Sequence, residues 1–105
     1  MGDNIRICEL NWMEYDRRLR EDAPVVMLPV GSLEQHGPHL PMNCDSLIPT
    51  AICESVAAET GGLVAPTITY GYKSQPKSGG GNHFPGTTSL DAQTLIFVVR
   101  DVIKE

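Results

Sequence analysis

The sequence predicts an α/β fold, specifically part of a layered αβα arrangement with a mainly parallel sheet. Two observations support this fold class. Short apolar runs rich in β-branched residues alternate with longer segments of helical period, in the order helix, strand, loop, helix, strand, long loop, helix. The length of 105 residues, without internal repeats, suits a single hydrophobic core. We therefore expect strands and helices of one domain.

The first helix and the two strands follow from local signals. Asn11 can cap a helix that runs to about Arg20, because an acidic residue, Glu14, lies three positions after it. Trp12, Tyr15 and Leu19 then fall on one face of that helix. The compact apolar run Val25–Val30 predicts a buried strand, and Leu63–Ala65 begins a second one.

A second helix is expected from about Leu47 to Glu59, after a Gly- and Pro-rich loop, Gly31–Cys44. Asp45 or Ser46 can cap it, and Pro49 falls in the first turn, where its missing N–H breaks no hydrogen bond. Gly61-Gly62 is a typical helix end. We expect four residues to lie on one side of this helix: Ile48, Ile52, Ser55 and Val56.

The last helix is predicted over Asp91–Lys104, after a loop over Pro66–Gly86. Its apolar positions repeat with helical period and need a covering surface. Because the sequence stops at this helix with few strands, we expect residues 1–105 to be the N-terminal portion of a single domain that is incomplete. The apolar positions are Leu95, Ile96, Val99, Val102 and Ile103.

Composition argues against several classes of partner. A net charge of −5 with scattered basic residues disfavours nucleic acid and anionic membranes. No apolar run approaches the roughly 18–20 residues of a membrane-spanning helix, and no secretory signal is visible. Cys8, Cys44 and Cys53 are odd in number and show no CxxC spacing, which favours a reducing cytoplasm.

The residues best suited to bind a metal ion follow the first strand. Glu34 and His36 are two apart, so in extended backbone they project from the same face, near the carboxyl end of the strand where sites form. Asp45, at the start of the next helix, can return to the same place. Carboxylates and an imidazole suit Zn or Mn, and a carboxylate can bridge two cations. A solvated surface pair is the alternative interpretation of Glu34 and His36.

Two other patterns do not support the sites they suggest. His39 extends Glu34 and His36 to a Glu-x-His-x-x-His pattern, but Gly37-Pro38 forbids the helix that such a zinc signature needs. The run Gly79–Gly81 lacks the spacing of a phosphate-binding loop, although glycines allow close approach of backbone to a small ligand. Ser78, next to that run, can offer a hydroxyl to the ligand.

Two segments of the sequence resemble motifs of the creatininase (creatinine amidohydrolase) family. Leu28–His36, "LPVGSLEQH", with Asp45 after it, is similar to the first family motif. Tyr70–Leu90, "YGYKSQPKSGGGNHFPGTTSL", is similar to the members that act on creatinine, while other members share mainly the "FPGT" of Phe84–Thr87. The similarity extends from about Cys8 to the end of the sequence.

The resemblance implies a binuclear centre of Zn or Mn, or both, and the reversible hydrolysis of the cyclic amide of creatinine to creatine. It implies that Glu34 and His36 each hold one metal ion, that Asp45 bridges both, and that Ser78 contacts the substrate. It also implies a homo-oligomer. The family's two further ligands, a His and a Glu of an Asn-Gly-His segment, are expected beyond Glu105, as are the aromatic and acidic residues that close over the substrate.

Two alternatives remain at this point. One is a sister amidohydrolase of the same family that acts on another amide, of the formamide deformylase type; the loop over residues 74–83 favours creatinine instead. The other is a non-catalytic fragment that only folds or associates, which the missing ligands favour for the isolated chain.

Overall fold

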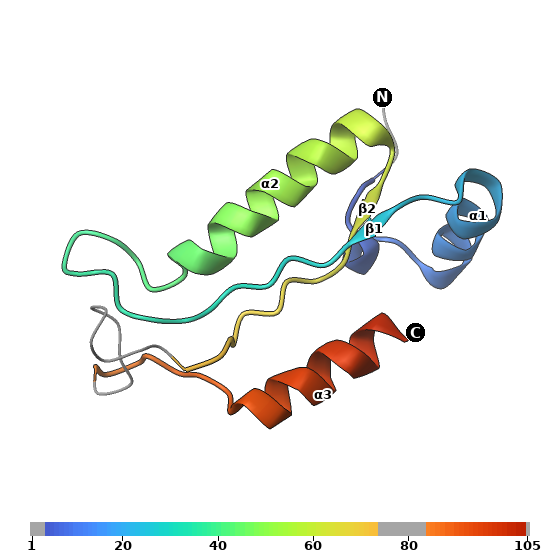
Figure 1. Ribbon diagram of the computed structural model, residues 1–105. Coiled ribbons are helices and arrows are strands. Elements are labelled where there is room, and N and C mark those ends of the chain that lie inside the picture. Colours follow the sequence, from blue (N-terminus) through green and yellow to red (C-terminus); the bar gives the residue numbers. More distant parts are fainter. Residues whose placement is uncertain (1–3, 74–83, 105) are drawn as a thin grey trace. The chain divides into compact units, whose positions relative to one another are not determined.

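The computed structural model describes residues 4–73 and 84–104. It contains helices α1 (Trp12–Asp22), α2 (Cys44–Thr60) and α3 (Ala92–Ile103), strands β1 (Val26–Met27) and β2 (Leu63–Val64), and a short 3-10 helix at Ile7–Glu9 (Figure 1). The chain divides into two compact units. Of the described residues, 4–29 and 48–67 form the first unit, and 30–47, 68–73 and 84–104 form the second.

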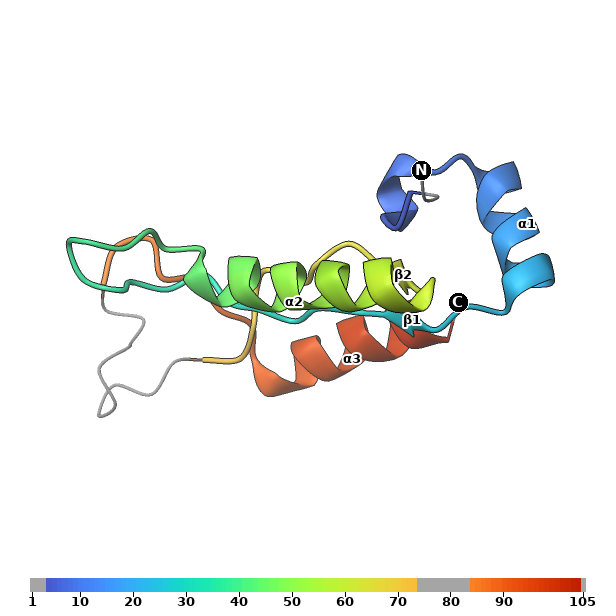
Figure 2. The ribbon, with the colours of Figure 1, turned by 90° about the horizontal axis from the view of Figure 1, so that it is seen from above.

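The first unit is built on a parallel β-α-β crossover. β1 pairs with β2 in parallel, with Val26 opposite Leu63 and Met27 opposite Val64. The C-terminal half of α2 lies beside this pair (Figure 2). Arg6 forms a further parallel bridge with Val64, so β2 has a neighbour on each side. The predicted α/β class and parallel pairing are confirmed.

Strand β1 is shorter and more exposed than the sequence predicts. The predicted buried strand Val25–Val30 is reduced to Val26–Met27, and Val25 is 72% exposed. The ladder continues one bond further, from the N–H of Ala65 to the carbonyl of Met27 at 2.8 Å. The next β1 residue that faces β2 is Pro29, which has no N–H to donate to it.

Helix α1 begins as predicted but buries a different residue. The side chain of Asn11 accepts a hydrogen bond from the N–H of Glu14 at 2.9 Å, which confirms the predicted cap. The apolar Trp12 and Leu19 are exposed, however, and the buried residue of α1 is Arg18.

Helix α2 begins earlier than predicted. The carbonyl of Asn43 accepts from the N–H groups of Ser46 and Leu47, so Asp45 lies inside the first turn and the prediction that Asp45 or Ser46 caps the helix is wrong. Pro49 lies within α2, and Gly61, with φ of 77°, ends the helix as predicted.

The predicted side of α2 is not the buried one. Ile48 and Ile52 are exposed, whereas the small Ala57 is fully buried and Thr50 bonds to Thr67 at 2.6 Å. The residue that α2 buries is therefore a small one, and the larger isoleucines remain outside the core of this unit.

Helix α3 confirms the prediction for Asp91–Lys104, with Asp91 at its N-terminal cap position. None of its residues is fully buried; Ile96, Val102 and Ile103 are exposed. None of the helices among the described residues is long and apolar enough to cross a bilayer. All three cysteines are free thiols.

Candidate metal centre

Three acidic or imidazole side chains converge in the second unit. Ligand atoms of Glu34, His36 and Asp45 all lie within 4.8 Å of one another. No other group of three such side chains comes together within residues 4–73 and 84–104. The convergence that the spacing predicts is therefore present, and His39 is not part of it. Ser78 lies outside the described residues.

The polypeptide places these side chains from two directions. Glu34 and His36 lie on the loop after β1, where the N–H of Glu34 donates to the carbonyl of Met42 at 3.2 Å. Asp45 lies in the first turn of α2. Gly31 lies against that turn so closely that a Cβ at position 31 would be 2.5 Å from the carbonyl oxygen of Asp45.

The orientation of His36 leaves one ring nitrogen facing the carboxylates. Nδ1 of His36 lies 3.1 Å from the backbone carbonyl of Glu34, a distance that fits an Nδ1–H donor. Nε2 then faces Oδ1 of Asp45 at 3.4 Å. The hydrogen bond to Glu34 raises the pKa of His36, and the charges of Asp45 and Glu34 also favour the imidazolium. With Nδ1 engaged by the backbone, Nε2 is the atom suited to a metal ion.

The carboxyl group of Asp45 is held by several groups at once. A hydrogen bond with the Glu34 carboxyl group is the main cause that lowers the pKa of Asp45, and the Ser32 hydroxyl contributes to the same shift. Ser32 Oγ donates to Asp45 Oδ2 at 2.9 Å. Two carboxyl groups in contact concentrate negative charge, which either a shared proton or a cation relieves. The donor set therefore fits a divalent cation.

Some residues around the centre were not anticipated from the sequence. Ser32 belongs to the motif Leu28–His36, but no local pattern in the sequence indicates that it bonds to Asp45. Thr87 is buried, and its Oγ1 accepts a hydrogen bond from the N–H of Gln35, between the two candidate ligands, at 3.0 Å. The "FPGT" motif, which ends at Thr87, was the available signal for this contact.

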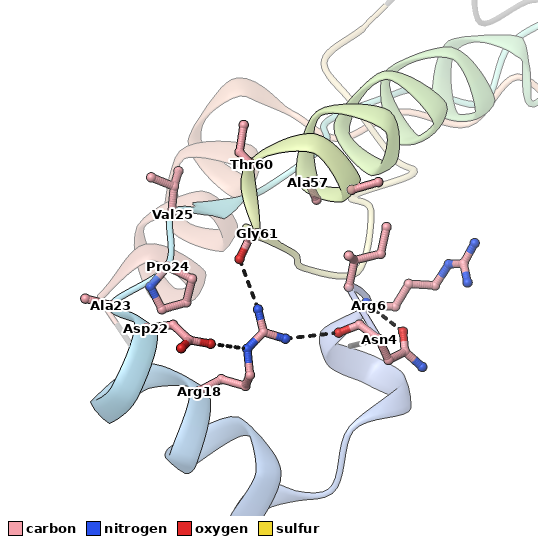
Figure 3. Close-up of a pocket in the computed structure, with 12 residues that line it drawn as sticks. Asn4, Arg6, Arg18, Asp22, Ala23, Pro24, Val25, Ala57, Thr60 and Gly61 are labelled. Carbon is pink, nitrogen blue, oxygen red and sulfur yellow. Dashed lines mark hydrogen bonds and ion pairs between the residues drawn. The ribbon is translucent and has the colours of Figure 1, made fainter. Parts of the chain in front are cut away.

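A separate hollow of about 1090 Å³ lies in the first unit and includes none of the candidate ligands. Figure 3 shows Arg18 at its centre, with Asp22, Asn4 and Gly61 around the guanidinium group. These contacts satisfy the buried charge, so we assign them a role in holding α1 in place rather than in chemistry.

Comparison with known proteins gives the family. The sequence matches the creatininase family, "Creatinine amidohydrolase", over residues 8–105. It is 57% identical over 105 residues to creatinine amidohydrolase of Pseudomonas putida, covering 100% of this chain and 40% of that protein. It is 40% identical over 85 residues to the mycofactocin precursor peptide peptidase of Mycolicibacterium smegmatis, covering 75% of this chain and 32% of that protein.

Solved structures agree with this assignment. A creatininase variant of Zn-Zn type is 56% identical, with a TM-score of 0.92, over 98% of this chain and 40% of that one. A creatininase described as the Mn form is 57% identical, with a TM-score of 0.92, over 97% and 40%. A creatininase variant complexed with creatine is 57% identical, with a TM-score of 0.90, over 97% and 39%.

The chain thus spans about 40% of the length of the Pseudomonas relative. The family match covers nearly all of it, and the creatininase structures share its fold at high identity. On this evidence the chain belongs to the creatininase (creatinine amidohydrolase) family.

Proposed function

We propose that this chain supplies Glu34, His36 and Asp45 to a binuclear metal centre of an amidohydrolase that interconverts creatinine and creatine. One observation above all supports the proposal. Three donor groups lie within 4.8 Å of one another in a chain that is 57% identical to a creatinine amidohydrolase. The Zn-Zn and Mn forms of related creatininases support Zn and Mn as the ions.

Each of the three residues has a distinct task in this proposal. Glu34 and His36 each hold one ion, His36 through Nε2, while its Nδ1 is engaged by the backbone carbonyl of Glu34. Asp45 would be the ligand that both ions share. Its Oδ2 accepts from Ser32 and, because a carboxylate oxygen has two lone pairs, can still bind an ion.

The chemistry is amide hydrolysis by water. When bound, divalent cations supply the Lewis acidity that activates water and polarises an amide carbonyl. The residues of this chain hold the donor atoms in position, and Ser32 keeps the Asp45 carboxylate oriented. Ser78 contacts the substrate.

The three donors cannot complete two catalytic sites by themselves. A catalytic cation usually has about three protein ligands and an open position for water. We therefore propose that residues 1–105 are the N-terminal portion of one creatininase-like domain and that further ligands come from polypeptide beyond it. The 40% coverage of the Pseudomonas relative supports this.

The metal assignment is tested by analysing metal content in the full-length protein. Asp45→Ala should lose both cations, because it removes the ligand that both share. Glu34→Ala and His36→Ala should each mainly weaken one site. His39→Ala is the matched control and should keep both cations, since His39 is not part of the converging set. Full occupancy in Asp45→Ala would contradict the bridging role.

The substrate assignment is tested at Ser78. In the full-length protein Ser78→Ala should slow creatinine hydrolysis while leaving metal content normal. Loss of one buried hydrogen-bond partner typically costs about 1–3 kcal/mol, or roughly 5- to 150-fold in rate or affinity. Kinetics and metal analysis on the same samples check this, and unchanged kinetics would show that Ser78 has no part in substrate binding.

A second candidate is a sister amidohydrolase of the same family that acts on another amide. The 40% identity to a mycofactocin precursor peptide peptidase supports this class. Faster turnover of a formamide or a peptide than of creatinine would favour it. A non-catalytic associating fragment is the third possibility, and it applies to the isolated chain only.

We further propose a cytoplasmic homo-oligomer. The three free thiols support a reducing compartment. Light scattering of the full-length protein tests the oligomeric state; a monomer would contradict it.

A further inference from the structure

The segment that contains the "FPGT" motif lies against the loop that bears Glu34 and His36. Both belong to the second unit, although about fifty residues separate them in sequence. Leu33 and Thr88 form an antiparallel bridge, and the N–H of Thr88 donates to the carbonyl of Leu33 at 3.1 Å. This backbone pairing brings the neighbouring Thr87 next to the peptide that joins the two ligands.

The Thr87 side chain makes the more specific of these contacts. Its Oγ1 accepts from the N–H of Gln35 at 3.0 Å, and the residue is only 9% exposed. Gln35 lies between Glu34 and His36, so this bond fixes the peptide from which both ligand side chains diverge. Because the bond is part-buried, solvent replaces it less readily than it would an exposed bond.

The turn before Thr87 is built for close approach. The N–H of Thr87 donates to the carbonyl of Phe84 at 3.2 Å, and Gly86 has a positive φ of 87°. A Cβ at position 86 would be 2.5 Å from Cε of Met42, whose carbonyl accepts from the N–H of Glu34. The same turn therefore lies close to the side chain of Met42 as well as to the Gln35 peptide.

We propose that Thr87 is a positioning residue for the metal centre. Through the Gln35 N–H it holds Glu34 and His36 in a chelating arrangement before a cation arrives. The bond of Thr87 is to the backbone N–H of Gln35, so it acts through the backbone. This inference rests on the proposed metal centre. It gives the threonine of the "FPGT" motif a role in positioning the metal ligands, in addition to its place in the turn.

The test measures the affinity of the full-length apoprotein for Zn²⁺ and Mn²⁺ by competition with a chromophoric chelator. Thr87→Val keeps the shape but removes the acceptor, and it should weaken binding about 10- to 100-fold, the range typical of lost outer-shell contacts. Thr87→Ser keeps the hydroxyl and should bind within about threefold of wild type, well short of that range.

A matched control lies one residue away. The Thr88 hydroxyl donates to the carbonyl of Gly86 at 2.9 Å, within the turn itself. Thr88→Val removes a hydroxyl of the same turn, one in an exposed hydrogen bond, without removing a bond to the ligand loop, so its metal affinity should stay near that of wild type. Urea unfolding of each apoprotein separates changes in stability from changes in affinity.

The outcomes are distinct. Normal affinity in Thr87→Val, or equal losses in Thr87→Val and Thr88→Val, would overturn the inference while leaving the proposed function intact. Absence of metal binding by wild type would overturn both. If Thr87→Val does not fold, Thr87→Cys replaces it, because a thiol is a weak acceptor of similar size. The affinity must then fall from Thr to Ser to Cys, and any other order contradicts the inference.

Discussion

Gly31 illustrates how one residue controls the spacing between the two halves of the donor set. A Cβ at this position would lie 2.4 Å from Ser46 Oγ and 2.5 Å from the carbonyl oxygen of Asp45. Real Cβ atoms essentially never approach backbone so closely. The first turn of α2 can therefore reach Ser32 and His36 only because position 31 has no side chain.

We expect Gly31→Ala to push the Asp45 turn away from the loop. The strain should lower the free energy of unfolding by about 1–3 kcal/mol, and metal affinity should fall with it. Gly61→Ala is the control: it has a positive φ of 77° but nothing within 4 Å of its Cβ. It should destabilise the protein without changing metal affinity. Urea unfolding and chelator competition measure both quantities, and unchanged affinity in Gly31→Ala would contradict this account.

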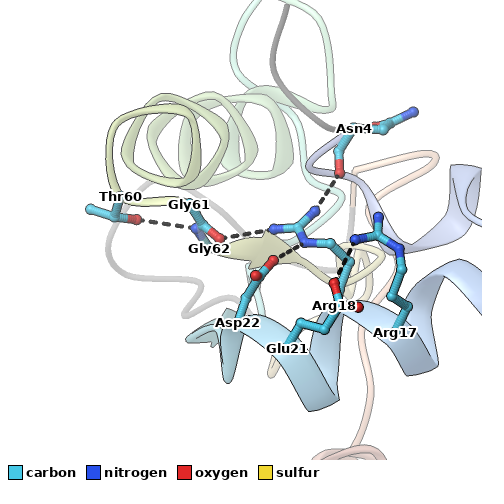
Figure 4. Close-up of polar contacts among 8 residues, drawn as sticks. All are labelled: Asn4, Arg17, Arg18, Glu21, Asp22, Thr60, Gly61 and Gly62. Carbon is cyan, nitrogen blue, oxygen red and sulfur yellow. Dashed lines mark hydrogen bonds and ion pairs between the residues drawn. The ribbon is translucent and has the colours of Figure 1, made fainter.

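At the scale of elements, Arg18 holds α1 to the end of α2. Its guanidinium group donates to Asp22 Oδ2 at 2.7 Å, to the carbonyl of Gly61 at 3.0 Å and to the carbonyl of Asn4 at 3.3 Å (Figure 4). The side chain is 4% exposed. A planar guanidinium suits these divergent acceptors, whereas a lysine ammonium is a single point on a flexible stem.

Arg18→Lys should therefore cost about 1–3 kcal/mol of unfolding free energy, because the part-buried hydrogen bonds of the guanidinium to the carbonyls of Asn4 and Gly61 are lost. Arg17→Lys is the matched control on the same helix. Arg17 and Glu21 form an exposed ion pair at 3.0 Å, and such pairs contribute at most about 1 kcal/mol. Urea unfolding of the two variants compares them, and equal midpoints would show that the Arg18 contacts do not stabilise α1.

At the scale of the molecule, the described residues bury little apolar surface. The fully buried apolar side chains among residues 4–73 and 84–104 are Ala57, Leu63 and Val64. Apolar side chains of all three helices remain exposed. So small a core cannot offset the conformational entropy lost by the 91 residues that the structure describes. Exposed apolar side chains at this density are typical of surfaces that are covered by further polypeptide.

We therefore expect the isolated 105-residue chain to self-associate or to be poorly stable, to bind metal weakly, and to lack catalytic activity. Light scattering, chelator competition and a creatinine assay measure these properties. Adding the remaining portion of the protein as a separate polypeptide should restore some activity. A monomeric, cooperatively folding 105-residue chain that hydrolyses creatinine at an enzyme-like rate would contradict this prediction.

Local signals in the sequence determined the start of α1, the end of α2, the extent of α3, the parallel class and the identity of the converging residues. The Asn11 cap, the Gly61 stop and the period of α3 depend on neighbours within a few positions, so they can be predicted from short windows. The Glu-x-His spacing likewise places two side chains on one side of extended backbone.

Tertiary structure decided which surfaces are buried and what holds the donor set in place. On α2 the buried residue is Ala57, whereas Ile48 and Ile52 are exposed, and hydrophobicity alone does not predict that choice. The bonds from Ser32 to Asp45 and from Gln35 to Thr87 join residues 13 and 52 positions apart. No local pattern encodes such partners, because the contact exists only after the chain between them has folded.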